Sequence, residues 1–216
     1  MYKGVIFDLD GTLIDTLRDL TTPINRVRQE YGLSPLTVKD VQYMVGNGFK
    51  VLVQKAMPNI DEDKIDGVVE KYKAYYAECY MDTSEPYEGI RDLLNELNSL
   101  GVKIAVNSNK GDAFTKNLIS KIFPDNAFVA VIGQREGIPK KPDPYTNMEI
   151  LGKMNLKNDE VLYVGDSQPD MKTAINSKLR AIGVSWGFRT VEELKEAGAD
   201  NIVYHPEEIL RIVKEG

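Results

Sequence analysis

Short apolar runs alternate along much of the chain with segments in which apolar residues recur every three or four positions. The apolar runs that we interpret as strands are residues 5–7, 102–106, 128–132, 161–164 and 181–184, with a last short one at 202–203. The periodic segments that we interpret as helices are residues 88–100, 112–123, 144–154, 171–177 and 191–197, followed by a C-terminal helix. Strands that alternate with helices indicate an α/β fold with a doubly wound parallel sheet.

Residues 15–85 depart from this alternation, because they show helical spacing and no strand pattern. Thr16 and Asp19 have the spacing of a capping box at the start of the first of these helices. We therefore predict two domains. Residues 1–14 and 86–216 form the α/β core, and residues 15–85 form an inserted, small α-helical domain.

Composition narrows the classes of function. The chain has 216 residues, 42% of them hydrophobic and 28% charged, with a net charge of −6. The acidic balance and the scattered basic residues argue against binding to nucleic acid or to a membrane surface. No apolar stretch is long enough to span a bilayer, and the N-terminus lacks a signal-peptide pattern, so we expect a cytoplasmic protein.

Cys79 is the only cysteine and His205 the only histidine. Disulfide frameworks, CxxC redox sites, Ser-His-Asp or Cys-His catalysis and His-ligated zinc are therefore not expected. Neither residue is assigned a role from the sequence. The chemistry must depend on carboxylates, hydroxyls, lysines and a metal ion.

The first strand ends in two carboxylates, within residues 5–13 (VIFDLDGTL). Ligands of parallel sheets bind at the carboxyl ends of the strands, where Asp8 and Asp10 are expected. Two neighbouring carboxylates repel each other, so keeping both ionised costs free energy unless a cation lies between them. Mg²⁺ prefers carboxylate oxygens, so we expect a magnesium site here.

Polar residues also follow the second strand, in residues 104–110 (IAVNSNK). The hydroxyl of Ser108 and the nearby N–H groups are suited to holding phosphoryl oxygens. A serine after a strand is also common as a turn residue or helix cap, and both readings stay open here.

Two further stretches carry candidate chemistry. In residues 139–144 (PKKPDP), Lys141 can neutralise charge on a phosphoryl group, although a solvated basic loop is the plainer reading. In residues 161–170 (VLYVGDSQPD), a strand ends at Asp166, a candidate metal ligand. Asp170 either orients Asp166 or Lys141, or caps the next helix.

These four stretches, in this order, resemble the four motifs of the haloacid dehalogenase (HAD) superfamily of phosphohydrolases. The resemblance extends over most of the chain and implies a Rossmann-like core with a small helical cap. It also implies Mg²⁺-dependent hydrolysis of a phosphomonoester through an aspartyl-phosphate. A lid that excludes bulky substrates favours a small phosphorylated metabolite, and we expect a monomer or a homodimer.

The resemblance also implies roles for individual residues. Asp8 is the nucleophile, Asp10 the general acid and base, and Lys141 the group that offsets phosphoryl charge. The implied metal ligands are Asp8, the backbone carbonyl of Asp10, and Asp166. Asp170 is expected to contact a ligand or Lys141 rather than the metal itself. The residues expected to contact the substrate or hold the groups around it are Thr12, Ser108, Asn109 and, in the cap, Gly48.

Within the superfamily the chain is most similar to phosphoglycolate phosphatase-like proteins. The alternatives are a pyrophosphatase, a β-phosphoglucomutase-like phosphotransferase and, from another class, a non-catalytic phosphorylatable switch. Asp10 argues against dehalogenases and phosphonoacetaldehyde hydrolases, which lack an aspartate at this position. Lys50 is then a solvated or substrate-facing lysine.

Overall fold

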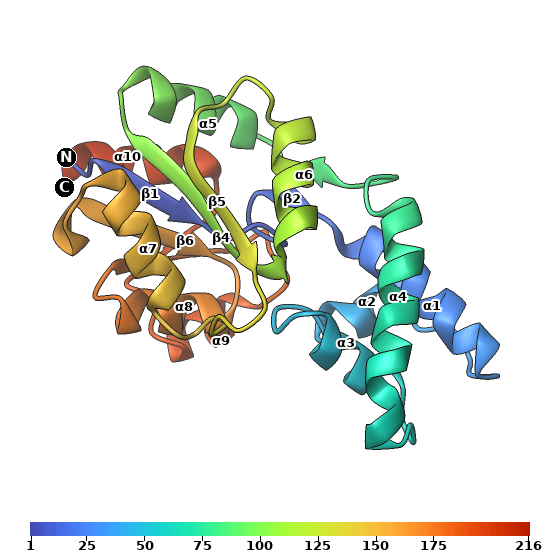
Figure 1. The fold of residues 1–216 in the computed structure, drawn as a ribbon. Coiled ribbons are helices and arrows are strands. Elements are labelled where there is room, and N and C mark those ends of the chain that lie inside the picture. The colour runs from blue at the N-terminus through green and yellow to red at the C-terminus, as the bar shows by residue number, and fades with distance from the viewer. The chain divides into compact units, whose positions relative to one another are not determined.

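The computed structural model describes residues 1–216, and the chain divides into two compact units (Figure 1). One unit consists of Met1–Ile14 and Pro86–Gly216, and the other of Asp15–Glu85. The chain passes between them at two short strands, β2 (Ile14–Asp15) and β3 (Glu85–Pro86), which pair with each other.

The larger unit contains a six-stranded sheet with the strand order β5-β4-β1-β6-β7-β8. All neighbouring strands are parallel, which confirms the predicted doubly wound α/β core. The strands are β1 (Gly4–Phe7), β4 (Lys103–Gly111), β5 (Phe128–Gln134), β6 (Val161–Gly165), β7 (Arg180–Val184) and β8 (Asn201–Val203).

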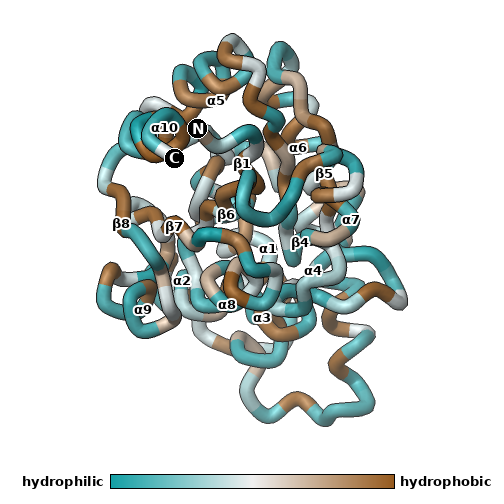
Figure 2. The backbone as a smooth tube through the Cα atoms, turned by 90° about the vertical axis from the view of Figure 1, so that its left-hand side faces the viewer, coloured by the Kyte–Doolittle hydropathy of each residue, from teal (hydrophilic) through white to brown (hydrophobic).

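Helices cover both faces of this sheet (Figure 1). They are α5 (Ile90–Ser99), α6 (Asp112–Ile122), α7 (Tyr145–Met154), α8 (Gln168–Asn176), α9 (Val191–Glu196) and α10 (Pro206–Glu215). Apolar side chains of α7, α8 and α9 share one buried cluster with the strands. Helices α5 and α10 contact each other on the opposite side of the sheet (Figure 1). In Figure 2, hydrophobic (brown) and hydrophilic (teal) residues alternate along α5 and α10, as expected of helices with one buried face.

Strand β1 lies at the centre of the sheet and positions the site. Phe7 pairs with Val106 of β4 on one side and with Val164 of β6 on the other. The backbone N–H of Asp8 continues the ladder to Val164, with an N···O distance of 2.9 Å. Residues that follow these three strands therefore meet at one edge of the sheet, next to the point where the strand order reverses.

Strand β4 is longer than predicted. The sequence predicts its end at Val106, whereas the strand continues to Gly111, with irregular pairing to β5 after Asn107. Residues 107–110 are polar, so hydropathy gives no strand signal there, yet all four are buried. Their side chains are held by hydrogen bonds and an ion pair, and these contacts replace apolar burial in this part of the strand.

The smaller unit contains helices and no strand beyond its ends. The helices are α1 (Leu17–Glu30), α2 (Val38–Gln42), α3 (Phe49–Ala56), the 3₁₀ turn η1 (Glu62–Lys64) and α4 (Ile65–Cys79). The rings of Tyr72 and Tyr76 are fully buried, and the ring of Phe49 meets each edge-on, with centroids 5.1 Å apart. These aromatic contacts join α3 to α4 and form part of the core of this unit.

The capping box predicted for Thr16 and Asp19 is wrong. The side chain of Thr16 makes no capping hydrogen bond at the start of α1. The Asp19 carboxylate is buried and accepts hydrogen bonds from Thr83 and Ser84, near the end of this unit. A buried carboxylate needs several donors, and the segment after α4 supplies them.

The lone cysteine and the lone histidine have structural positions. The Cys79 thiol donates to the carbonyl oxygen of Tyr75 in α4, and burial raises its pKa. His205 precedes α10, and its backbone N–H donates to the Glu208 carboxylate. No helix of the chain combines the length and hydropathy needed to cross a bilayer.

Candidate active site

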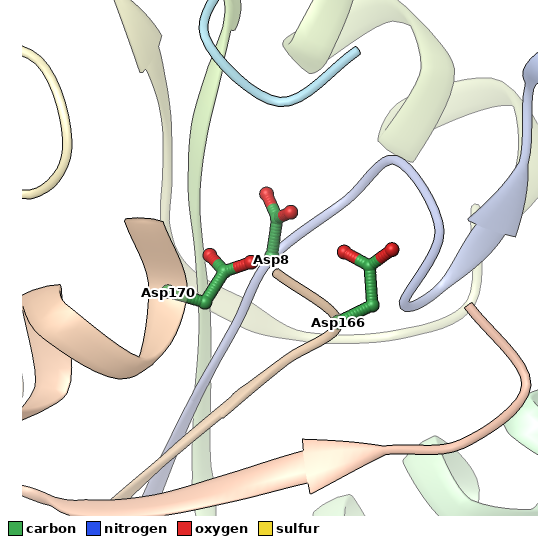
Figure 3. Close-up of side chains that lie close together, drawn as sticks. All are labelled: Asp8, Asp166 and Asp170. Carbon is green, nitrogen blue, oxygen red and sulfur yellow. The ribbon is translucent and has the colours of Figure 1, made fainter. Parts of the chain in front are cut away.

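Three carboxylates converge at the carboxyl edge of the sheet. Asp8 directly follows β1, Asp166 directly follows β6, and Asp170 lies in the first turn of α8 (Figure 3). All three are buried, and one oxygen of each lies within 4.8 Å of an oxygen of the others. The central position of β1 and its pairing with β6 explain why segments 158 residues apart meet here.

Lys141 joins two of these carboxylates. Its Nζ atom lies 2.7 Å from Asp8 Oδ1 and 2.7 Å from Asp170 Oδ1, and its side chain is 3% exposed. Asp170 also receives hydrogen bonds on its other oxygen from the backbone N–H and the hydroxyl of Ser167. Asp170 therefore holds Lys141, one of the roles weighed from the sequence, and it supports the start of α8 as the third helical residue of a capping box whose N-cap is Ser167.

The burial of these groups shifts their protonation equilibria. Burial raises the pKa of Asp8 to about 7, and the Asp170 carboxylate adds to the shift while Lys141 opposes it. Burial also raises the pKa of Asp166 well above its usual range, although the Phe188 N–H donates to its Oδ2 at 2.7 Å. Burial alone lowers the pKa of Lys141, but the carboxylates of Asp170 and Asp8 raise it well above its ordinary value.

Asp10 is not one of the three converging carboxylates, and it forms an ion pair with a different lysine. Asp10 Oδ1 lies 2.7 Å from the Nζ atom of Lys110, whose side chain is 1% exposed. The loop that carries Asp10 turns at Gly11, with φ of +86°, and a Cβ atom there would lie 2.2 Å from Asp166 Oδ2. Trp186 also holds the loop, because its indole N–H donates to the Thr12 carbonyl oxygen at 3.1 Å.

The charges of the site suit a divalent cation. When all four carboxylates (Asp8, Asp10, Asp166 and Asp170) are ionised, the two ammonium groups (Lys110 and Lys141) leave two negative charges to balance. Ligand oxygens on opposite sides of Mg²⁺ are about 4.2 Å apart, close to the spacing of the three converging carboxylates. Oxygen donors, spacing and excess negative charge all fit a hard divalent metal.

Asn109 fixes the segment that carries Lys141. The Lys141 N–H donates to Asn109 Oδ1 at 2.9 Å, and Asn109 Nδ2 donates to the Lys141 carbonyl oxygen at 3.3 Å. One side-chain amide therefore holds both polar atoms of the Lys141 backbone. This geometry gives Asn109 a positioning role that its prediction as a substrate contact did not include.

Comparisons with known proteins identify the family of the chain. A family model described as haloacid dehalogenase-like hydrolase matches residues 5–184. The chain belongs to the haloacid dehalogenase-like hydrolases.

Relatives of this HAD-like hydrolase are phosphatases. It is 34% identical to a phosphoglycolate phosphatase of Pseudomonas putida over 189 residues, which cover 85% of this chain and 70% of that protein. It is 33% identical to a phosphoglycolate phosphatase of Agrobacterium fabrum, covering 86% of this chain and 82% of that protein. A crystal structure of a candidate phosphoglycolate phosphatase from Lactobacillus delbrueckii subsp. bulgaricus superimposes with a TM-score of 0.92, at 33% identity and 98% coverage of both chains. The chain is therefore an enzyme of the phosphatase type.

Thr12 and Ser108, two of the predicted site residues of the HAD-like hydrolase, are both buried. The hydroxyl of Thr12 has no hydrogen-bond partner within the protein. The Ser108 hydroxyl accepts from the Lys110 N–H at 3.2 Å. Ser108 lies inside β4 rather than after it, and it is neither a free turn residue nor a helix cap.

The remaining candidates lie in the helical unit. Gly48 precedes α3 with φ of +84°, a conformation that favours glycine. Lys50, within α3, forms an ion pair with Asp66 of α4 at 2.7 Å and remains about half exposed.

Sequence reasoning missed Lys110 and the positioning role of Asn109. The sequence of residues 107–110 contained one usable signal, because a lysine close to the end of a buried strand needs a counter-charge if it is buried as well. The partner itself could not be read from the chain, since Asp10 lies 100 residues away from Lys110.

Proposed function

We propose that the enzyme hydrolyses a small phosphomonoester with Mg²⁺ through a phosphoryl intermediate on Asp8. The observation that carries this proposal is the convergence of Asp8 and Asp166, within 4.8 Å, beside the buried ammonium group of Lys141. A buried carboxylate next to a fixed cation is suited to nucleophilic attack on a phosphate ester.

The reaction has two steps that use this chain's own residues. In the first, a carboxylate oxygen of Asp8 bonds to phosphorus, the ester bond breaks, and Asp10 gives its proton to the leaving oxygen. In the second, Asp10 takes a proton from water, the water oxygen bonds to phosphorus, and the bond from phosphorus to Asp8 breaks. The products are an alcohol and inorganic phosphate, and both aspartates return to their initial states.

The cations of the site reduce the repulsion between Asp8 and the phosphate. Lys141 already contacts Asp8, so its ammonium group lies where the equatorial oxygens of the phosphoryl group gather negative charge. Asp8, Asp166 and the carbonyl oxygen of Asp10 would hold Mg²⁺, and Asp170 would orient Lys141. Bound Mg²⁺ supplies further positive charge at the phosphoryl oxygens.

The helical unit, residues 15–85, acts in this proposal as a cap that limits the size of the substrate. Gly48 and the polar groups of Ser108 and Thr12 are the proposed substrate contacts. The names of the relatives favour 2-phosphoglycolate as the substrate.

The test is a phosphate-release screen with Mg²⁺ over 2-phosphoglycolate, pyrophosphate, glucose 1-phosphate, a nucleotide and a phosphopeptide. We expect release from 2-phosphoglycolate and little from the phosphopeptide. Asp8→Asn should abolish release while the thermal unfolding transition stays cooperative, and the exposed control Asp92→Asn on α5 should leave release unchanged. Substantial turnover by Asp8→Asn would refute the nucleophile, and rapid release from the phosphopeptide would refute the cap.

A further inference from the structure

The ion pair between Lys110 and Asp10 is the buried charge contact that the mechanism above does not yet use. We propose that Lys110 is a positioning residue for Asp10, and that it determines which oxygen of Asp10 exchanges a proton with the substrate. This inference rests on the proposed function, because it assigns a partner to the general acid and base of that reaction.

Two lysines contact three of the four carboxylates of the site. Lys141 contacts Asp8 and Asp170, whereas Lys110 contacts Asp10. Both ammonium groups are almost completely buried, and a buried charge without a partner is strongly destabilising. Asp10 is therefore held by a cation other than the one that contacts the nucleophile.

The backbone on both sides of this pair is fixed. Lys110 lies in β4, and its N–H donates to the Ser108 hydroxyl at 3.2 Å, while its carbonyl oxygen accepts from the Thr115 hydroxyl at 3.1 Å. On the other side, the loop after Asp10 is tied to Trp186 through the Thr12 carbonyl. With both backbones held, the ion pair directs Oδ1 of Asp10 toward Lys110.

The chemistry of an ammonium group makes the two oxygens of Asp10 unequal. A protonated lysine only donates hydrogen bonds, so Asp10 Oδ1, which it contacts, acts as the acceptor. The proton that Asp10 transfers is then carried on Oδ2. In the first step that proton moves from Oδ2 to the leaving oxygen as the ester bond breaks, and in the second step Oδ2 receives a proton from the attacking water.

The test compares two esters that differ in the basicity of the leaving group. Phenyl phosphate releases a strongly basic phenolate that needs a proton, whereas p-nitrophenyl phosphate releases a stable anion that needs little help. Stopped-flow absorbance of the released phenols measures the rate of the first step for the wild type and for Lys110→Met, Lys110→Arg and Asp10→Asn. The control is Lys116→Met, which removes the exposed pair between Lys116 and Asp112 on α6, 2.6 Å apart.

We expect Lys110→Met to slow the first step with phenyl phosphate about tenfold or more, within the range of general acid catalysis. The same step with p-nitrophenyl phosphate should slow less than about threefold, and a burst of p-nitrophenolate should precede slow turnover, because the second step also needs Asp10. KM should not rise, Lys110→Arg should recover part of the rate, and Lys116→Met should match the wild type.

An equal loss on both esters, or a rise in KM, would overturn the inference, because Lys110 would then act on the phosphoryl group or the substrate itself. Asp10→Asn distinguishes this result from failure of the proposed function. If Asp10→Asn shows the leaving-group pattern and Lys110→Met does not, the inference alone is wrong. If Asp10→Asn lacks the pattern, the role of Asp10 in the proposed function fails as well.

Discussion

Asn109 connects two segments that each carry charge for the site. Its amide holds both the N–H and the carbonyl of Lys141, and the Lys141 side chain then reaches Asp8 and Asp170. Asn109 is itself buried, so the amide satisfies backbone groups that water does not reach. At the scale of single residues, the position of the ammonium group next to Asp8 therefore depends on an amide that holds the backbone of Lys141.

We predict that Asn109→Ala lowers the free energy of unfolding by about 1–3 kcal/mol, because it leaves two buried backbone groups unsatisfied. It should also lower kcat more than it changes KM, since Lys141 loses its support. Urea unfolding and steady-state kinetics measure the two effects, with the exposed Asn117→Ala on α6 as the control. An increase in KM at unchanged kcat would instead support the direct substrate contact expected from the sequence.

The strands and helices themselves were largely predictable from hydropathy, whereas the carboxyl edge of the sheet was only partly so. The buried runs before Asp8 and Asp166 carry a strong apolar signal, and a parallel sheet brings their ends together. The end of β4 did not follow this rule, because the polar residues 107–110 remain in the strand through their side-chain contacts. Such pairings join segments far apart in the chain, and local patterns contain no information about them.

Among the candidate site residues, those that directly follow a predicted strand were the easiest to find. Asp8 and Asp166 lie at the edge where the sequence placed them, and Lys141 lies between Asp8 and Asp170. The contacts of Thr12, Asn109 and Lys110 depend on side-chain directions that only the assembled sheet defines.

The loop between β1 and β2 yields a prediction at the scale of an element. Gly11→Ala should sharply reduce activity, because the added Cβ atom would lie 2.2 Å from Asp166 Oδ2 and the residue already has φ of +86°. Gly101→Ala is the matched control, with φ of +72° and no atom within 4 Å of the added Cβ.

Both substitutions strain the backbone by about 1–2 kcal/mol, so both should lower the free energy of unfolding by at least that amount. Only Gly11→Ala should also lower kcat at least tenfold in a phosphate-release assay. Equal kinetic effects of the two variants would show that the contact between Gly11 and Asp166 has no role in the site.

Across the whole molecule, the larger unit buries more negative than positive charge at the edge of its sheet. When all four carboxylates are ionised, the two ammonium groups balance only half of their charge, and this excess opposes folding until a cation binds. Metal binding to the folded state alone must then stabilise the protein as a whole.

We predict that Mg²⁺ raises the Tm of the EDTA-treated wild type in a concentration-dependent manner. At a Mg²⁺ concentration of about 100 times Kd, the free energy of unfolding should increase by about 2.7 kcal/mol. Asp166→Asn should lose most of this response, because it removes a ligand and one excess charge, while Asp92→Asn should retain it. A differential scanning fluorimetry titration measures the shift, and an undiminished response in Asp166→Asn would remove Asp166 from the metal site.

The most direct test of the account is whether phosphorus becomes covalently attached to Asp8. In Asp10→Asn the second step lacks its base, so the intermediate should accumulate during reaction with p-nitrophenyl phosphate and Mg²⁺. Rapid acid quench, proteolysis and mass spectrometry should then find one phosphoryl group on the peptide that contains Asp8, and none after the same treatment of Asp8→Asn. Release of p-nitrophenolate without a phosphorylated peptide, or phosphorylation at another residue, would contradict the account.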